Sequence, residues 1–189
     1  MFNINSITVS IVSHNQGAMI IQLLDQLAGC PMNIAKVVIT QNTNSDKPIK
    51  NKYPFEMTVL KNLRPLGFAA NHNQAFQFCE TSHFCVMNPD ISIINEPFEA
   101  LLSCFEDLSV SVVAPIIIDK NGKQEDSARY FPTPLGLVRK MFSSYDGTFP
   151  IDNHDSIIFP DWIGGMFMLF STKKFEELAG FDEKYFLYY

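Results

Sequence analysis

FCVMNPDI, residues 84–91, is the most informative part of this sequence, because an apolar run there ends abruptly on Asn-Pro-Asp. Residues Phe84–Met87 are a short apolar run of the kind that forms a strand buried on both faces. Pro89 has no backbone N–H and pushes the preceding residue into an extended conformation, so the strand must end there. Asp90 is therefore left at the carboxyl end of a core strand, which is where open α/β sheets bind their ligands. In isolation Asn-Pro-Asp more often makes a simple turn, so its function has to be judged from the surrounding sequence.

The surrounding sequence alternates apolar strands with amphipathic helices. Strands are expected, in order, at residues 7–12, 36–40, 57–60, 84–87, 110–118 and 163–170. Helices are expected from a cap at Ser13 or Asn15 through Ala28, and at residues 69–80, 97–105 and 171–179. Because a strand, a helix and a second strand in this order favour a right-handed crossover, we predict an α/β fold with a mostly parallel sheet flanked by helices.

Two later stretches are less regular. Residues 119–122, DKNG, are typical of a hairpin turn, which predicts a return strand near residues 127–131. From residue 132 to residue 160 the periodicity is weak, and Pro, Gly, Asp and Ser are common. We interpret this stretch as a loop or short helix that covers a site.

Size and composition are those of an ordinary globular domain. The chain has 189 residues, of which 47% are apolar and 18% are charged. The 17 phenylalanines are spread along the chain, which favours core packing over a stacking surface. The net charge of −6 argues against nucleic acid as a partner, because binding to a phosphate backbone needs clustered positive charge.

The cysteines and the apolar segments indicate the compartment. Cys30, Cys79, Cys85 and Cys104 show no metal-ligand spacing, which argues against a zinc site, and we expect a reduced, cytoplasmic protein. The N-terminus shows neither the basic region nor the cleavage site of a signal peptide, and the longest apolar runs are too short to span a bilayer. Peripheral association with the inner face of the cell membrane is compatible with this sequence.

Polar residues follow three of the expected strands directly. These clusters are Ser13-His14-Asn15, QNTNSD at residues 41–46, and Asn88-Pro89-Asp90. Because the carboxyl ends of parallel strands meet at one edge of a sheet, we expect the three clusters to lie together. A lone carboxylate at that edge, Asp90, can hold a hard divalent cation against a diphosphate.

A fourth polar segment, NLRPLGFAAN at residues 62–71, lies at the start of an expected helix. Gly67 permits a close backbone approach, and the helix start offers unpaired N–H groups to an anion. The segment is neither a GxGxxG sequence nor a lysine-bearing phosphate loop, so both of those nucleotide sites are weakly supported. The four histidines lack metal-ligand spacing, which favours packing or surface roles for them.

Taken together, these residues resemble the inverting family 2 glycosyltransferases of bacterial surface-polysaccharide synthesis, especially the rhamnosyltransferase-like members. The matching motifs are VSIVSHN at residues 9–15, the polar cluster at 41–46, NLRPLGFAANHNQA at 62–75, VMNPDI at 86–91, DKNGKQEDSARYFPTP at 119–134, DWIGGMFML at 161–169 and GFDEKYFLYY at 180–189. The resemblance covers almost the whole chain. It implies a GT-A fold that transfers a sugar, rhamnose by analogy with that branch, from a nucleotide-diphosphate sugar to a saccharide or lipid-linked acceptor with inversion.

The resemblance also implies which residues contact the nucleoside. Ser13, His14 and Asn15 would border it, partly through backbone groups. Gln41 stands where the family usually has an aspartate that contacts the base. Glutamine can still hydrogen-bond the edge of a pyrimidine, but without charge, so this departure bears on base preference and affinity.

Further residues of the family's motifs would lie along the rest of the donor. Gly67, Phe68 and Asn71 would line the ribose and the phosphates. Asn88 and Asp90 take the place of a DxD pair, with Asp90 as the ligand of Mg²⁺ or Mn²⁺. Such a cation would neutralise the charge that grows on the departing nucleoside diphosphate.

The resemblance places the acceptor side and the general base later in the chain. Trp162, Gly164 and Gly165 would shape the wall near the transferred sugar and the acceptor. The family pattern continues after FLYY with a Glu-Asp pair that supplies the general base, and this sequence ends at Tyr189. We therefore expect residues 1–189 to hold the donor-binding portion of a GT-A domain, incomplete at the C-terminus, with little or no transferase activity. Asp182 is a weaker candidate for direct chemistry, and a turn or cap role is favoured for it.

Two alternatives remain open from the sequence. The chain can be a non-catalytic nucleotide-sugar-binding remnant or an interaction module that kept only the fold. A sugar-nucleotide pyrophosphorylase shares the fold, but it needs a Gly-rich, Arg/Lys-bearing loop after the first strand, and residues 14–17, HNQG, do not provide one.

Overall fold

The structure is a computed structural model that describes residues 6–30, 34–43, 49, 52–125, 127–131, 133, 149 and 157–186. The chain divides into a larger unit, residues 1–115 with 166–189, and a smaller unit, residues 116–165. Within the described ranges, no helix is both long enough and apolar enough to cross a membrane.

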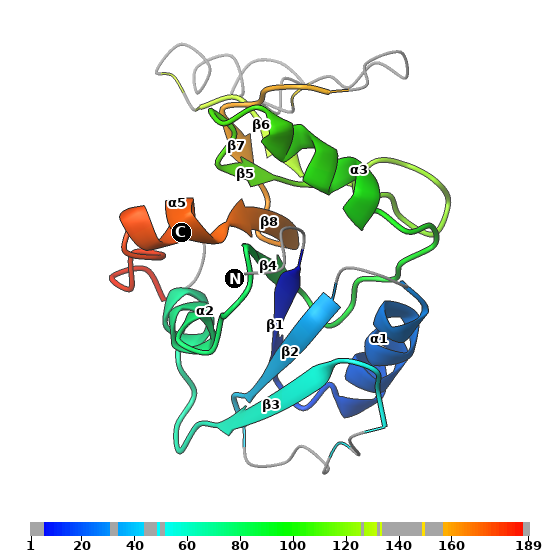
Figure 1. Ribbon diagram of the computed structural model, residues 1–189, viewed down its shortest axis with the longest axis vertical. Coiled ribbons are helices and arrows are strands. Elements are labelled where there is room, and N and C mark those ends of the chain that lie inside the picture. The colour runs from blue at the N-terminus through cyan, green and yellow to red at the C-terminus, as the bar shows by residue number, and fades with distance from the viewer. Residues whose placement is uncertain are drawn as a thin grey trace, which may run out of the picture. The chain divides into compact units, whose positions relative to one another are not determined.

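The larger unit is built on a six-stranded sheet with the strand order β3-β2-β1-β4-β8-β5 (Figure 1). Its strands are β1 (Ile7–Ser13), β2 (Ile34–Gln41), β3 (Glu56–Lys61), β4 (His83–Met87), β5 (Val112–Val113) and β8 (Phe167–Ser171). Strands β1 to β4 run parallel to one another, and β8 pairs antiparallel with both β4 and β5. The predicted α/β fold with a mostly parallel sheet is confirmed.

Two helices cover opposite faces of the parallel strands. α1 (Gly17–Gly29) joins β1 to β2, and α2 (Phe68–Phe76) lies between β3 and β4 in the chain. Figure 1 shows them on opposite sides of β1, β2 and β3. The two connections cross the sheet in opposite directions, so right-handed crossovers place their helices on opposite faces. Both helices follow carboxyl strand ends, at the same edge of the sheet.

The central strands form the core. All seven residues of β1 and all five of β4 are buried, as expected for strands covered on both faces. The apolar spacing of α1 predicts a buried face of Met19, Ile20, Leu23, Leu24 and Leu27; the last four are buried, whereas Met19 is exposed. The remaining helices of this unit in the described ranges are α3 (Phe98–Ser103), the 3₁₀ turn η1 (Cys104–Glu106) and α5 (Thr172–Glu177).

An aromatic cluster joins the C-terminal part of the larger unit to the sheet. The ring of Phe175, in α5, lies 4.7–5.1 Å from the rings of Phe76, Phe84, Phe170 and Phe181. The rings are tilted or edge-on, which is the favourable geometry for aromatic pairs. These phenylalanines serve core packing, as their spread along the sequence predicts.

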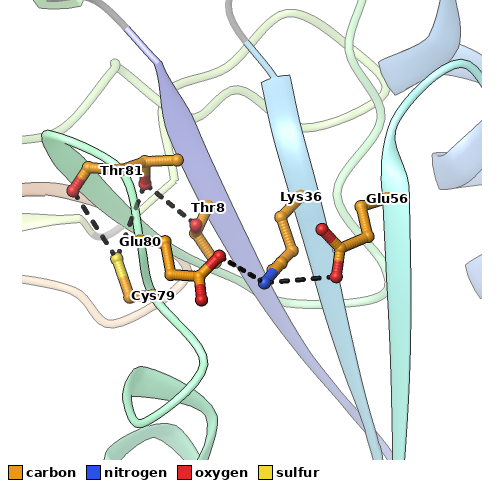
Figure 2. A network of polar contacts seen from close by, with 6 residues as sticks. All are labelled: Thr8, Lys36, Glu56, Cys79, Glu80 and Thr81. Carbon is orange, nitrogen blue, oxygen red and sulfur yellow. Dashed lines mark hydrogen bonds and ion pairs between the residues drawn. The ribbon is translucent and has the colours of Figure 1, made fainter. Parts of the chain in front are cut away.

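Lys36 connects three segments near the amino ends of the strands (Figure 2). Its Nζ lies 3.2 Å from a carboxylate oxygen of Glu56, in β3, and 3.2 Å from one of Glu80, which precedes β4. The lysine side chain is 9% exposed, whereas those of Glu56 and Glu80 are 62% and 78% exposed. Burial lowers the pKa of Lys36, but the hydrogen bonds and charges of the two glutamates together raise it above its ordinary value.

Hydroxyl groups continue this network toward β1 (Figure 2). Thr81 Oγ1 lies 2.9 Å from Thr8 Oγ1 and 3.5 Å from the sulfur of Cys79. The network therefore ties the connection between α2 and β4 to the starts of β1, β2 and β3, away from the carboxyl edge.

The start of α1 differs from the prediction. The helix begins at Gly17 with Gln16 at the cap position, so the predicted cap at Ser13 or Asn15 is wrong. Ser13 Oγ accepts a hydrogen bond from the Gln16 amide at 3.2 Å, outside the helix itself. Asn15 has a φ of 66°, the left-handed conformation that asparagine tolerates better than most residues. A left-handed residue cannot occupy the extended cap position.

The end of α2 also differs from the prediction, which extends this helix to Glu80. The helix ends at Phe76, because the amides of Phe78 and Cys79 bond to carbonyls three residues back rather than four. This tight turn lets the chain enter β4 sooner.

Two predicted strands are shorter than expected. The strand predicted at residues 110–118 is reduced to Val112–Val113, and Pro115 explains the early end because it has no N–H for a strand ladder. The strand predicted at residues 163–170 is divided by residues 164–166 into β7 (Trp162–Ile163) and β8. Two consecutive glycines at the break weaken the preference for continuous extended structure.

The predicted hairpin is wrong in its pairing. A strand does form at β6 (Ala128–Arg129), inside the predicted range, but it pairs with β7 rather than with residues 110–118. The predicted turn at residues 119–122 does form, with the Gly122 amide donating to the Asp119 carbonyl at 3.0 Å, but the pairing that it closes is a short antiparallel bridge between Ile118 and Gln124. Most of residues 132–160, interpreted as a loop over a site, lies outside the described residues.

Candidate functional site

The polar clusters predicted to meet at one edge of the sheet follow adjacent parallel strands. Ser13 ends β1 opposite Gln41, which ends β2, and Ile11 pairs with Met87 at the end of β4. The described residues that directly follow these strands therefore lie at one carboxyl edge, whereas residues 44–46 of the cluster after β2 lie outside the described residues. The amide of Asn42 donates to the Ser13 carbonyl at 2.9 Å, so the pairing of β1 and β2 extends into the first polar residue.

Asp90 is exposed at this edge. It is the third residue after β4, and the turn that presents it is held by hydrogen bonds of Asn88. The Asn88 amide donates to the Met166 carbonyl at 2.9 Å, and the Asn88 carbonyl accepts from the amide of Ile91 at 3.3 Å. The carboxylate is thus at the surface of the larger unit and not in its interior, which the metal hypothesis requires.

A complete metal site made by the protein alone is not present in the described part of the chain. No group of three or more His, Cys, Asp or Glu residues lies close enough there to hold an ion. One exposed carboxylate fits a Mg²⁺ or Mn²⁺ ion that takes its other ligands from a diphosphate and water, as these ions do in many phosphate sites. Asp90 matches that requirement.

Three buried asparagines hold the carboxyl ends of β2 and β3 and the start of α2 together. Asn62 donates from Nδ2 to Oδ1 of Asn42 and to Oδ1 of Asn71, both at 2.7 Å. Asn71 donates from its own Nδ2 to the carbonyls of Leu66 at 3.0 Å and Gly67 at 2.9 Å. All three amides are therefore satisfied in the interior, which such buried polar groups require.

Asn42 also forms a pair of hydrogen bonds with the backbone of Leu66. Its Oδ1 accepts from the Leu66 amide and its Nδ2 donates to the Leu66 carbonyl, both at 2.8 Å. The same Nδ2 lies 3.3 Å from Nε2 of His14, whose residue is exposed. The loop before α2 is thus fixed against the ends of β1 and β2.

Asn71 and Gln41, predicted to touch the donor, have little access to solvent. Asn71 is fully buried and Gln41 is 4% exposed. The Gln41 carbonyl accepts from the Asn62 amide at 3.0 Å, which continues the pairing of β2 and β3. In this structure Asn71 shapes the loop that carries Gly67 and Phe68.

The first turn of α2 is covered by the chain near residue 186. The amide of Phe68 donates to the carbonyl of Phe186 at 3.1 Å. A Cβ added to Gly67 would lie only 2.6 Å from that same carbonyl oxygen, so glycine is needed here for a close backbone approach, as predicted. The approaching group in this structure is Phe186, and an anion at this amide would have to replace it.

His72 is a buried residue of α2 and not a surface residue. It is 1% exposed, and its Nδ1 is 2.8 Å from Oγ of Ser10 in β1. Burial lowers the pKa of His72 to about 3, so the ring is neutral under ordinary conditions. It serves packing between α2 and β1, the role that the sequence favours for such a histidine.

Asp182 is exposed and makes turn contacts. Its Oδ1 accepts from the Lys184 amide at 3.0 Å, and its Oδ2 lies 4.0 Å from the Lys184 ammonium group. These contacts fit the turn role that the sequence favours for Asp182.

Trp162, Gly164 and Gly165, predicted to form the acceptor wall, belong to the smaller unit. Trp162 pairs with Arg129 between β7 and β6 and is 41% exposed. The Gly164 amide donates to the Ser127 carbonyl at 2.8 Å. These contacts give the smaller unit its local order around an exposed indole.

Asn42 and Asn62 are the residues of this region that sequence reasoning did not single out. Asn42 lies inside one polar cluster and Asn62 begins another segment, but neither spacing shows that the two amides meet. The only sequence signal is the position of each asparagine directly after the last residue of β2 or β3.

The comparisons with known proteins point to glycosyltransferases. No protein family model matches this chain. The low-salt glycan biosynthesis hexosyltransferase Agl10 of Haloferax volcanii is 20% identical over 192 residues, which cover 98% of this chain and 59% of the relative.

Several solved structures share the fold. S. aureus TarS 1-349 superposes with a TM-score of 0.61 at 14% identity, over 95% of this chain and 51% of that chain. The mannosyltransferase PcManGT from Pyrobaculum calidifontis, solved with GDP-Man and Mn²⁺, superposes with a TM-score of 0.55 at 16% identity, over 94% of this chain and 47% of that chain.

The chain spans about three fifths of the curated relative and about half of the solved chains that it matches. Structural similarity at these low sequence identities establishes the fold, whereas the reaction has to be inferred from the residues of the site. The six-stranded, mostly parallel sheet flanked by helices is therefore a glycosyltransferase-like fold, with its polar strand ends at the carboxyl edge.

Proposed function

We propose that this chain binds a nucleotide-diphosphate sugar at the carboxyl edge of β1, β2 and β4, as the donor-binding part of a GT-A glycosyltransferase. The observation that carries the proposal is that polar segments follow the carboxyl ends of the adjacent parallel strands β1, β2 and β4, and that the segment after β4 contains an exposed Asp90. Open α/β sheets bind ligands at this edge. Following the family resemblance, the reaction is inverting transfer of a sugar, rhamnose in the first instance, to a saccharide or lipid-linked acceptor in surface-polysaccharide synthesis.

The related proteins support a nucleotide sugar as the ligand. TarS has been solved in complex with UDP and with UDP-GlcNAc, and the mannosyltransferase with GDP-Man and Mn²⁺. The curated relative is a hexosyltransferase by name. These ligands all contain a nucleoside diphosphate, so the shared element of the proposal is that group and not a particular base or sugar.

The residues at the edge suit the reaction. Asp90 would hold Mg²⁺ or Mn²⁺, which supplies charge neutralisation for the leaving nucleoside diphosphate when it is bound. The backbone around Ser13, His14 and Asn15 would border the nucleoside. Asn42 and Asn71 fix the loop 62–67, so the peptide groups near the phosphates are ordered before the ligand arrives.

The test is calorimetry of UDP, GDP and dTDP binding with and without Mn²⁺. For at least one nucleotide we expect metal-dependent binding that Asp90→Asn weakens by about tenfold or more, because a neutral amide is a poorer ligand for a hard cation. Asp107→Asn is the matched control, because Asp107 is an exposed carboxylate in a turn after η1. Unchanged metal-dependent binding in Asp90→Asn would overturn the metal role. If none of the three nucleotides binds to the wild-type chain, the proposed function is overturned.

A further inference from the structure

Asn42 stands at the junction of the three segments that form the candidate site. It follows β2, contacts the loop before α2 through Leu66, and contacts His14 after β1. The residue is fully buried. Its hydrogen bonds indicate which nitrogen of the His14 ring carries the proton.

The orientation of the Asn42 amide is fixed by the backbone. The Leu66 N–H can only donate and the Leu66 C=O can only accept, and each is 2.8 Å from one end of the amide. Rotating the amide by half a turn would place two donors together and two acceptors together. Asn62 strengthens the assignment, because its Nδ2 donates to the same Oδ1 at 2.7 Å. The atom of Asn42 that faces His14 is therefore Nδ2, a donor.

The orientation of the Asn42 amide indicates which nitrogen of the neutral His14 ring carries the proton. The Nε2 atom lies 3.3 Å from Asn42 Nδ2, and a hydrogen bond between these nitrogens requires Nε2 to accept. A neutral imidazole whose Nε2 accepts carries its proton on Nδ1. Nδ1 has no partner among the described residues, and His14 is exposed. The ring is thus left with one free N–H donor.

We propose that Asn42 is a positioning residue that keeps His14 in the Nδ1-protonated form, so that this N–H donates to an acceptor oxygen of the bound nucleoside diphosphate. The choice of a nucleoside diphosphate as the ligand rests on the proposed function. The assignment of the proton to Nδ1 does not, because it follows from the hydrogen bonds of Asn42. His14 is then a ligand-binding donor at the edge of β1, and Asn42 acts only through it and through the Leu66 backbone.

The position of the proton on the His14 ring is tested first, without any ligand. Long-range ¹H–¹⁵N NMR spectra of the wild-type chain distinguish a protonated from an unprotonated imidazole nitrogen, and His14→Asn identifies the His14 signals by their loss. We expect Nδ1 protonated and Nε2 unprotonated in neutral buffer. Protonation at Nε2 in the wild-type chain would overturn the proposal, whatever the variants do.

Asn42→Asp tests whether Asn42 causes this state. The carboxylate places an acceptor opposite Nε2, so the proton is expected to move to Nε2, while the other oxygen still accepts from the Leu66 amide. The first oxygen also faces the Leu66 carbonyl, which it cannot donate to, so this variant is destabilised and its spectrum is compared only after its fold is verified. Gln22→Glu is the matched amide-to-carboxylate control at an exposed position of α1, and it should leave the His14 signals unchanged. A folded Asn42→Asp chain with an unchanged His14 spectrum would contradict the positioning role.

The donor role is tested by calorimetry with UDP and Mn²⁺. His14→Asn keeps an N–H donor close to the position of Nδ1 and should stay within about threefold of the wild-type affinity, whereas His14→Ala should lose about five- to tenfold. Equal binding by wild type and His14→Ala would overturn the donor role. If the wild-type chain binds no nucleotide, the proposed function fails, and the NMR result still decides the state of His14 separately.

Discussion

His72 and Ser10 form a polar contact in the core, where a charge would be expensive. The pKa of His72 falls from 6.5 to about 3 because burial disfavours the charged ring. The unfolded chain therefore binds a proton more readily than the folded one. The stability contributed by the neutral ring is complete above pH 6.5 and is lost as the pH falls from 6.5 toward 3.

The direction of this pH dependence gives a measurable prediction for His72→Asn, whose side-chain amide lies close to the position of Nδ1 and keeps a hydrogen-bonding partner for Ser10 but cannot titrate. Between pH 6 and pH 4 the free energy of unfolding of the wild-type chain should fall more steeply than that of the variant, by about 1.4 kcal/mol per pH unit at most. Urea denaturation at several pH values measures both slopes. Parallel slopes would show that His72 is accessible to protons in the folded state.

Ala179 is a second residue whose conformation has an energetic cost. It follows α5 with a φ of 57°, and its amide bonds to the Glu176 carbonyl at 2.9 Å. Glycine adopts this left-handed conformation without the steric penalty that a Cβ introduces. We expect Ala179→Gly to raise the free energy of unfolding by about 0.5–1 kcal/mol in chemical denaturation. Ala100→Gly, inside α3 and exposed, is the control and should lower it by up to about 1 kcal/mol. A destabilised Ala179→Gly chain would contradict the assignment of strain.

Between elements, the Lys36 network holds β2, β3 and the chain before β4 at their amino ends (Figure 2). Because both glutamates are mostly exposed, we expect Glu56→Gln and Glu80→Gln each to cost under about 1 kcal/mol. The double variant leaves the buried ammonium group without an acidic partner, so its cost should exceed the sum of the single costs. A double-mutant cycle of urea denaturation measures this coupling. Additive costs would show that the two glutamates act on Lys36 independently or that neither matters.

The pH dependence of this network has the opposite direction to that of His72. The pKa of Lys36 is raised in the folded chain, so its contribution to stability is complete below pH 10.5 and declines as the pH rises through the folded pKa. The two groups therefore limit stability at opposite ends of the pH scale, and neither limit involves the carboxyl edge.

The elements that the sequence predicts well are those whose pattern is local. β1, β2 and β4 are runs of apolar and β-branched residues buried on both faces, and α1 has a clear apolar stripe. The pairing of β6 with β7 could not be predicted, because it depends on contacts across about 35 residues that no turn sequence specifies. The position of Asp90 after a core strand was predictable for the same local reason that β4 was.

The asparagine network could not be predicted, because its members gain their role only in three dimensions. Asn42, Asn62 and Asn71 are ordinary loop and helix residues in the sequence, and only the adjacent ends of β2 and β3 bring their amides together. The same holds for the first turn of α2, where the helix start was expected to face an anion and its Phe68 amide bonds to the Phe186 carbonyl instead.

At the scale of the whole larger unit, Asn73 connects the last described segment to the first half of the chain. Its Oδ1 accepts from the Phe181 amide and its Nδ2 donates to the Phe181 carbonyl, both at 2.9 Å. Gly180 has a φ of 79°, and a Cβ there would overlap Asn73 Oδ1. This contact and the packing of the Phe181 ring against Phe175 hold residues 180–186 over α2.

If this pair of hydrogen bonds positions residues 180–186, its loss should be felt at the start of α2, where the Phe186 carbonyl bonds to Phe68. We expect Asn73→Ala to increase amide hydrogen exchange at Phe181 and Phe68 by about tenfold or more, because both amides lose a fixed acceptor while the core strands keep theirs. Gln74→Ala, on an exposed position of the same helix, is the control and should change neither amide. Faster exchange at Phe181 alone would mean that the aromatic cluster holds residue 186 without help from Asn73. Unchanged exchange at both amides would mean that the whole segment is fixed by Phe181 and Phe175, and that the hydrogen bonds of Asn73 only satisfy its own side-chain amide.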